Sequence, residues 1–161
     1  MSGDSGIRDT DLGMEKIRAQ IAALAELSIK AGILEDAGSR DGVPVAEYAA
    51  WNEYGVPGTE EKWAIPPRPF IRGYVDDNGE KIKNIQEMLV AQVIDGKIDP
   101  DTAADKLGKN TKEGIKHYIK TSSNFTPNAP ATVKRKGTNR PLVETGLLRR
   151  SVNYKVVKGS K

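Results

Sequence analysis

The sequence of 161 residues predicts an α+β fold, in which a small antiparallel sheet is packed by several helices and the elements are joined by long loops. In three segments apolar residues recur every three or four positions, the spacing of an amphipathic helix. In two others, one early and one late in the chain, apolar and polar residues alternate as in half-buried strands. Residues 56–69 and 122–141 are rich in proline, glycine and polar residues and predict loops.

The first ten residues are small and polar, and they predict a flexible tail (residues 1–10) ahead of a single domain (residues 11–161). We expect Asp11 to cap the first helix. The apolar stripe of that helix would consist of Met14, Ile17, Ile21, Leu24 and Leu27. A strand is predicted over residues 28–35. Its inner face would hold Ile29, Ala31 and Ile33.

Residues 36–43 are turn formers, and Pro44 then suits the first turn of a short helix that ends at Gly55. The prolines of residues 56–69 exclude both a helix and a central strand, so this loop should run extended along the surface. A helix is predicted over residues 70–93, with a possible break at Asn78 and Gly79.

Asp99 and Pro100 predict the start of another helix, which continues to Thr121. Residues 122–141 form an arm-like loop, and loops of this length are usually functional or ordered only on binding. Residues 147–157 predict a closing strand, with Gly146 relaxing the turn before it. This strand and the one at residues 28–35 would pair in the antiparallel sheet, whose one face the helices cover.

Hydrophobic residues make up 37% of the chain and charged residues 29%, which predicts a soluble protein. No apolar run approaches the length of a membrane span, and the N-terminus lacks the apolar stretch of a signal peptide, so no membrane partner is expected. The absence of cysteine excludes disulfides and cysteine-based metal sites and fits synthesis in the cytoplasm.

The net charge of +3 conceals an asymmetry along the chain. Residues 1–80 hold 8 Lys and Arg against 15 Asp and Glu, a net charge of −7, whereas residues 81–161 hold 17 against 7, a net charge of +10. Such a chain could bind a second copy head to tail or turn a basic face to a polyanion.

The sequence does not indicate an enzyme. His117 lies in a helical segment without a neighbouring carboxylate or serine for a catalytic relay, so we expect a surface or packing histidine. Asp95, Asp99 and Asp101 lack the ligand spacing of a calcium loop, and helix capping explains them better. We therefore expect no catalytic residue, no metal site and no cofactor.

Two groups of residues are candidates for binding. The first is a basic loop that could neutralise phosphates or meet the acidic face of a neighbouring subunit. It comprises Lys134, Arg135, Lys136, Arg140, Arg149 and Arg150. The second group surrounds the proline-rich loop and would anchor it, either in the core or at an interface. It comprises Trp51, Tyr54, Trp63, Arg68 and Phe70.

Three stretches resemble the neck and tail-completion proteins of tailed bacteriophages, which join the head to the tail. They are VAEYAAWNEYG (residues 45–55), IPPRPFIRG (residues 65–73) and APATVKRKGTNRPLVETGLLRRSVNY (residues 129–154). The segment DGKIDPDTAADKLG (residues 95–108) also fits this family, and the resemblance covers most of residues 28–157.

The resemblance implies a structural virion protein that is made in the bacterial cytoplasm and forms a homo-oligomeric ring, typically six-fold. The ring would lie between the head connector and the tail tube, with DNA passing through its lumen. A tail terminator or minor tail protein has a similar small α+β architecture and stays open as an alternative. Two alternatives of other classes are a sequence-independent DNA-binding protein and a phage-encoded accessory or host-interacting factor.

Overall fold

A computed structural model describes residues 13–59, 64–143 and 145–159, and it confirms the α+β class. The predicted flexible tail, the predicted cap Asp11 and the predicted anchor Trp63 lie outside these residues. The elements in chain order are α1 (Met14–Ala25), β1 (Leu27–Ile33), β2 (Ser39–Arg40), β3 (Val43–Pro44), α2 (Val45–Tyr54), α3 (Arg72–Ile94), α4 (Pro100–Thr121), α5 (Pro130–Lys136), α6 (Leu147–Ser151) and β4 (Val152–Lys158).

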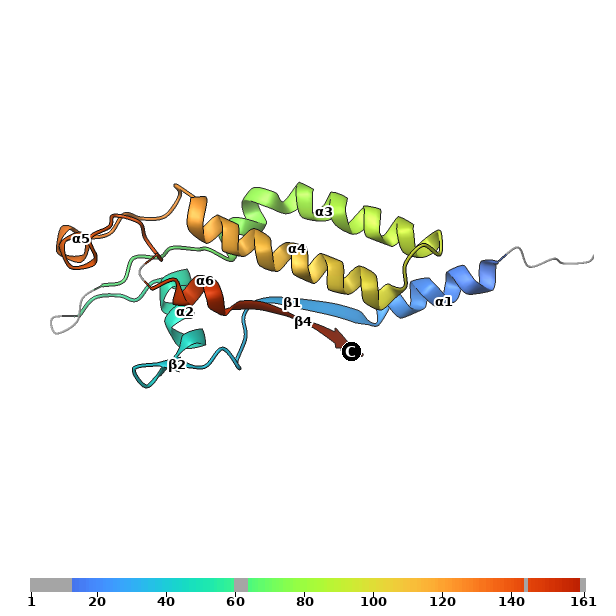
Figure 1. Cartoon of the computed structure of the whole chain (residues 1–161), viewed down its shortest axis with the longest axis horizontal. Coiled ribbons are helices and arrows are strands. Elements are labelled where there is room, and N and C mark those ends of the chain that lie inside the picture. The colour runs from blue at the N-terminus through green and yellow to red at the C-terminus, as the bar shows by residue number, and fades with distance from the viewer. Residues whose placement is uncertain (1–12, 60–63, 144, 160–161) are drawn as a thin grey trace, which may run out of the picture.

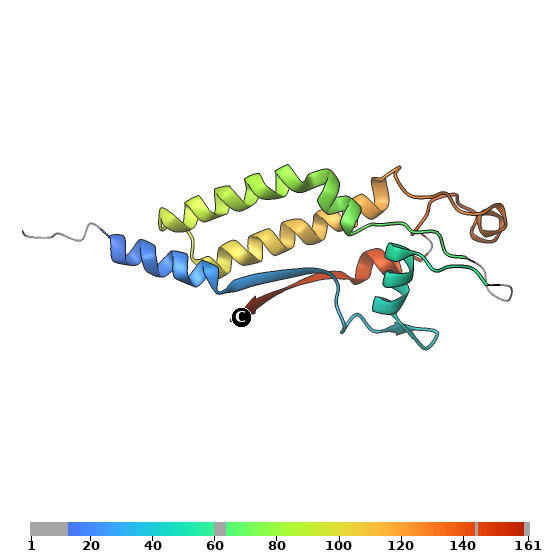
Figure 2. The same cartoon turned by 180° about the vertical axis from the view of Figure 1, so that it is seen from behind.

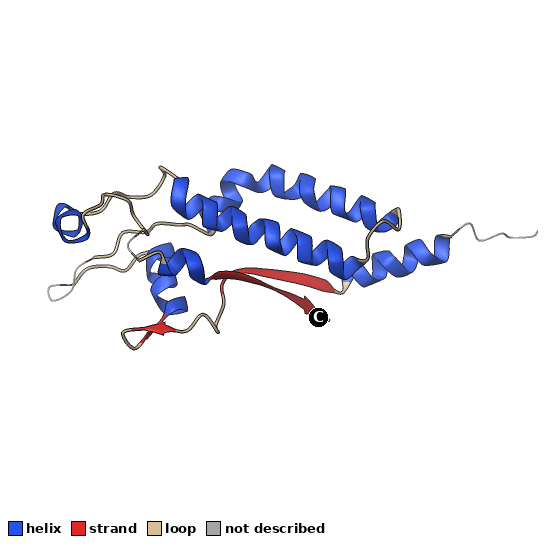
Figure 3. Cartoon of the chain, viewed as in Figure 1, coloured by secondary structure: helices blue, strands red, loops and turns tan. Residues whose placement is uncertain are grey.

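The molecule is elongated, with its longest helices parallel to the long axis (Figure 1). Helices α3 and α4 form an antiparallel hairpin, and α4 lies against one face of the β1–β4 ribbon. Seen from behind, α2, α5 and α6 gather at one end of the molecule and α1 extends from the other (Figure 2). No helix of the described chain covers the opposite face of the ribbon, as the colouring by secondary structure shows (Figure 3).

Strands β1 and β4 pair antiparallel, from Leu27 opposite Lys158 to Ile33 opposite Val152, which confirms the predicted pairing of the early and late strands. Ala31 and Ile33 pack against the core, as the alternation predicted. Lys30 lies opposite Lys155 and both side chains are exposed. The sheet has only these two strands in the described chain, so both of its outer edges are unpaired.

Two glycines of α4 let tyrosines from other elements approach the helix closely. A Cβ atom at Gly108 would overlap the ring of Tyr154 from β4, and one at Gly114 would overlap the ring of Tyr74 from α3. The hydroxyl of Tyr154 also donates a hydrogen bond to Asp105 on α4. Because glycine has no side chain at these two positions, α4 can pack closely against both the sheet and α3.

The apolar core has two parts. The larger part joins α2, α3, α4, α6 and β4 around the fully buried Phe70. It consists of Ala49, Phe70, Tyr74, Ile115, Ile119, Phe125, Leu142, Leu148 and Val152. The smaller part, Leu89, Val93 and Ala103, lies near the α3–α4 turn, and Leu24 of α1 packs on it. Helix α1 itself contains no buried residue.

The predicted start of α4 and the predicted break in α3 can both be compared with the structure. Asp99 caps α4, where its side chain accepts a hydrogen bond from the backbone N–H of Thr102 (2.8 Å), as predicted. The possible break at Asn78 and Gly79 is wrong, because α3 runs unbroken through them and the Asn78 side chain donates to the carbonyl of Tyr74 (3.0 Å). Within the described residues, no helix has both the length and the apolar character needed to cross a membrane.

Three predictions about the C-terminal part were wrong in detail. The arm-like loop contains α5, which begins with Pro130 in its first turn and ends at Gly137 in the left-handed conformation. The first part of the predicted closing strand is α6, whose Leu148 is buried in the core, and the strand begins only at Val152. Gly146 is left-handed at the N-cap of α6, not a relaxed turn before a strand.

Smaller differences occur in the N-terminal half. Leu27, predicted on the first helix, begins β1, because α1 ends at Ala25. Residues 36–43, predicted only as a turn, contain most of the β2–β3 hairpin, which extends to Pro44 and has Asp41 and Gly42 both at positive φ. Such a pair of residues is typical of the two-residue hairpin turn. Pro44 lies at the N-cap of α2, and Gly55 ends that helix as predicted.

We predict opposite effects of two Gly→Ala substitutions in the long helices. Gly108→Ala should lower the free energy of unfolding by about 1–3 kcal/mol, because the new methyl group overpacks against Tyr154. Gly79→Ala, which meets no atom within 4 Å, should raise it by about 0.5–1 kcal/mol, because alanine loses less entropy in a helix. Urea denaturation measures both. Equal stabilities of the two variants would contradict the close approach of Tyr154.

Candidate functional site: the loop clasp and the cationic surfaces

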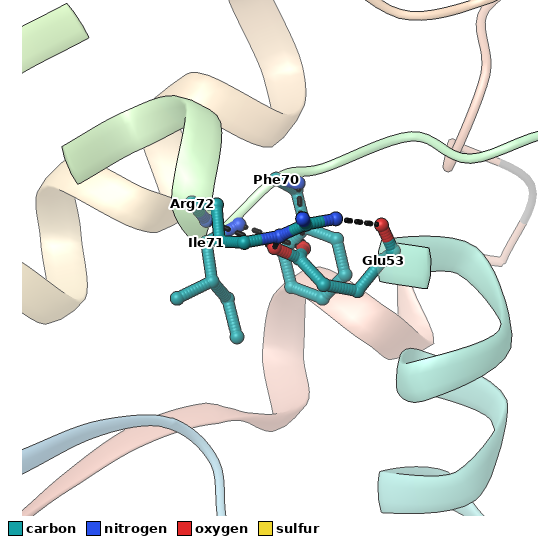
Figure 4. A network of polar contacts seen from close by, with 4 residues as sticks. All are labelled: Glu53, Phe70, Ile71 and Arg72. Atoms are coloured by element: carbon teal, nitrogen blue, oxygen red, sulfur yellow. Dashed lines mark hydrogen bonds and ion pairs between the residues drawn. The ribbon is translucent and has the colours of Figure 1, made fainter. Parts of the chain in front are cut away.

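Glu53 in the last turn of α2 is buried and binds the beginning of α3 (Figure 4). Its carboxylate accepts hydrogen bonds from the backbone N–H groups of Phe70 (2.8 Å), Ile71 (3.0 Å) and Arg72 (2.9 Å). The first N–H groups of a helix have no partner within the helix, and an anion there also interacts favourably with the helix dipole. Glu53 is therefore a helix cap supplied by a distant segment.

Arg72 completes this contact by compensating the buried charge. Its Nε donates to Glu53 Oε1 (3.1 Å) and its Nη2 donates to the backbone carbonyl of Glu53 (2.7 Å). The guanidinium group also lies 4.6 Å from the ring centroid of Tyr54, at cation–π distance. Buried charge is tolerated in proteins when it is paired and hydrogen-bonded, and both conditions hold for Glu53.

Arg68 fastens the proline-rich segment to the residues after α4. Its backbone N–H donates to the carbonyl of Asn52 (2.6 Å), and its Nε donates to the carbonyl of Thr126 (2.8 Å). Its Nη2 reaches the carbonyl of Pro127 (3.3 Å) and Oδ1 of Asn128 (3.4 Å). Burial lowers the pKa of Arg68 from its ordinary value. We call Asn52, Glu53, Arg68, Phe70 and Arg72 the loop clasp.

The predicted loop anchors lie in different environments. Phe70 is 0% exposed at the centre of the core, and Arg68 is buried in the loop clasp. Tyr54 is 67% exposed beside Arg72, while Trp51 is half-buried and lines a cavity of about 290 Å³ together with Arg135 and Lys136. Phe70 and Arg68 thus hold one subunit together, and Trp51 and Tyr54 are the anchors that a partner could reach.

The six predicted basic residues do not form one loop. Lys134, Arg135 and Lys136 occupy the last turn of α5. Arg149 and Arg150 lie on α6 and face α4, and Arg140 lines a small cavity with Lys120 between these two groups. The structure therefore presents two cationic surfaces, one on α5 and one between α4 and α6.

The second surface is a groove of about 590 Å³, which we call the α4–α6 groove. It is lined by Glu113, Lys116, His117, Lys120, Arg149 and Arg150. Lys116 forms an ion pair with Glu113 (3.2 Å), and Arg150 Nη1 donates to the carbonyl of Thr145 (2.8 Å). Glu113 is the only acidic residue among these six, so the groove carries a positive net charge.

Sequence reasoning did not identify three members of these sites. Glu53 was not recognised because its partners follow it only after the proline-rich loop. Lys116 and Lys120 were not singled out, although their spacing of four places them on the same face of a helix. His117, expected to be a surface or packing residue, has an exposed side chain that lines the groove.

A polar cleft of about 500 Å³ lies on the other side of His117, between α3 and α4. In it Asp77 accepts hydrogen bonds from the hydroxyl of Tyr118 (2.7 Å) and the amide of Asn124 (3.1 Å). Across the described ranges, no three His, Cys, Asp or Glu side chains are grouped so that they could hold a metal ion. The Asp77 contacts join α3 to the segment that Arg68 also holds.

We predict that Glu53→Gln lowers the free energy of unfolding by about 1.5–3 kcal/mol, because it replaces a charged acceptor with an amide that cannot accept all these hydrogen bonds. Glu47→Gln, an exposed change on the same helix, should stay within about 0.5 kcal/mol. Urea denaturation gives both values. Amide hydrogen exchange of Ile71 and Arg72 should accelerate only in the Glu53 variant, and unchanged exchange would contradict the cap.

We predict that Arg68→Lys loosens the segment after α4, because one ammonium group cannot replace the several contacts of a guanidinium. The free energy of unfolding should fall by about 1–3 kcal/mol. Limited trypsin digestion should cut faster at Lys134, Arg135 and Lys136. The control Arg40→Lys, at an exposed site, should change neither property. Cleavage at the wild-type rate in the Arg68 variant would contradict the contact.

Comparison of the chain with protein-family models, curated proteins and solved structures gave no match. The resemblance to neck and tail-completion proteins therefore rests on the motifs of the sequence itself.

Proposed function

We propose that the chain is a non-catalytic structural protein of the head–tail junction of a tailed bacteriophage and forms a closed ring of identical subunits. The observation that carries this proposal is an apolar surface on α1 that the rest of the described chain leaves exposed. The sequence motifs supply the phage context. In this proposal the protein is made in the host cytoplasm, becomes part of the virion neck, and contacts the head connector and the tail tube.

Helix α1 packs on the rest of the subunit only through partly buried residues. None of its residues is buried, and Met14 and Ile21 are 54% and 49% exposed. It has 12 residues, a length at which an isolated helix is only marginally stable in water. Its N-terminal part also projects past the α3–α4 turn (Figure 1). A second protein surface that covers Met14 and Ile21 would supply the packing that α1 lacks.

A second copy of the chain is the partner we propose for α1. The subunit has two unlike ends, with α1 at one and the basic elements α5 and α6 at the other. The N-terminal half of the sequence carries a net charge of −7 and the C-terminal half +10, so oppositely charged segments of two copies can attract each other. A head-to-tail contact between unlike surfaces repeats, and it closes into a ring when the rotation allows.

The motif resemblance suggests six subunits in the ring. A tail terminator or minor tail protein would use the same kind of contact at a different position in the virion. An accessory or host-interacting factor, by contrast, would be missing from purified virions, so mass spectrometry of the particles distinguishes it from a neck protein.

We predict that Ile21→Asp abolishes the ring and leaves the subunit folded, because Ile21 contributes little to the core of the single subunit. The free energy of unfolding should fall by no more than about 0.5–1 kcal/mol. Val75→Asp is the matched control, with 47% exposure in the first turn of α3, away from the α3–α4 turn, and its ring should persist. Mass photometry measures the oligomer, and negative-stain microscopy shows its shape.

In infected cells, phage that carry Ile21→Asp should accumulate unjoined heads and tails. A wild-type chain that stays monomeric at every concentration tested would refute the ring. Equal loss of the oligomer in both variants would show that α1 is not the contact surface.

A further inference from the structure

We propose that the α4–α6 groove binds the phosphate backbone of nucleic acid without regard to base sequence. This site differs from the α5 surface and from the α1 contact, and it does not depend on ring formation. Arg149 and Arg150 were candidate binding residues from the sequence, and the structure places Lys116, His117 and Lys120 beside them.

The geometry of the groove suits a chain of anions. Lys116 and Lys120 lie one helical turn apart on α4 and form one wall, while Arg149 and Arg150 on α6 form the other. Lys120 also lines the neighbouring cavity with Arg140, so the cations continue beyond the groove as a track. A backbone with regularly spaced phosphates can contact several positions of such a track at once.

The cations of the groove are largely uncompensated. The side chains of Lys120 and Arg149 make no hydrogen bond or ion pair with other described residues, and both are exposed. Glu113 pairs with Lys116, and Arg150 uses one of its several N–H donors on the carbonyl of Thr145. Like charges gathered in this way repel one another, and a bound anion would remove that repulsion.

Both walls are held rigidly by the core. Ile115 and Ile119, the neighbours of Lys116 and Lys120 in sequence, are buried, and so are Leu148 and Val152 beside the two arginines. The backbone of the groove is therefore already ordered before any ligand binds. Binding then costs mainly the ordering of side chains, which favours affinity.

The lining of the groove favours phosphate over base recognition. No aromatic side chain except the imidazole of His117 lines it, so bases lack the platforms on which they usually stack. Arginine binds phosphate through two parallel hydrogen bonds, and the groove offers two such side chains. The expected ligand is therefore the sugar–phosphate backbone, bound through hydrogen bonds and counterion release.

The test compares two triple variants that remove the same number of charges. The groove variant is Lys120→Ala, Arg149→Ala and Arg150→Ala, and the arm variant is Lys134→Ala, Arg135→Ala and Lys136→Ala. Fluorescence anisotropy with a labelled duplex of about 20 base pairs measures binding from about 50 to about 200 mM salt. Circular dichroism and urea denaturation check the fold, and the single variant Lys120→Ala, which leaves α6 unchanged, serves if the groove variant unfolds.

We expect the wild-type chain to bind the duplex with a steep dependence on salt. The groove variant should lose about tenfold or more in affinity, and the slope of log K against log salt should decrease by roughly 2–3, since each lost phosphate contact removes about 0.9. For Lys120→Ala the slope should decrease by about 0.9. The arm variant should bind within about threefold of the wild type, because its charges do not line the groove and salt screens their effect on it.

Three results would overturn the proposal. The first is absence of duplex binding by the wild-type chain at about 50 mM salt. The second is an equal loss in the groove and arm variants, which would assign binding to the overall charge. The third is equally tight binding of poly-glutamate, which would indicate an acidic protein partner. All three measurements use the isolated chain, so a failure of the ring in mass photometry leaves them unaffected.

Discussion

The hydrogen bonds that Glu53 accepts determine where α3 begins, and most of the molecule depends on that position. Helix α3 packs on α4, and α4 packs on the β1–β4 ribbon. The motifs AAWNEYG (residues 49–55) and IPPRPFIRG (residues 65–73) are thus two halves of one contact, the first supplying the carboxylate and the second the N–H groups. Loss of either half leaves buried polar groups of the other without partners, the costly situation in a protein interior.

The two ends of the subunit are stabilised in different ways. At one end the loop clasp, the core around Phe70 and the contacts of Arg68 hold α2, α6 and the start of α3 together. At the other end α1 makes only partial contacts through residues such as Leu24. In our proposals the well-packed end carries the rigid groove for nucleic acid, whereas the sparsely packed end gains its stability from a neighbouring subunit.

Local patterns predicted the elements whose signals are local. The Asp99 cap of α4, the Gly55 end of α2 and the alternation that pairs β1 with β4 were all visible in the sequence. Helix α5 was missed although Pro130 and Gly137 mark its ends, because seven residues are too few to show a helical period. The α4–α6 groove was not predictable, because folding brings Lys116 and Lys120 of α4 to the arginines of α6.

The pairing of β1 with β4 also determines the order in which parts of the fold can form. The two strands come from opposite ends of the described chain, whereas α3 and α4 are consecutive in sequence and can form their hairpin early. During synthesis β1 emerges long before its partner, so the ribbon can form only after α2, α3, α4 and α6 have been made. A nascent chain therefore lacks the finished ribbon until β4, the last element of the described chain, has been made.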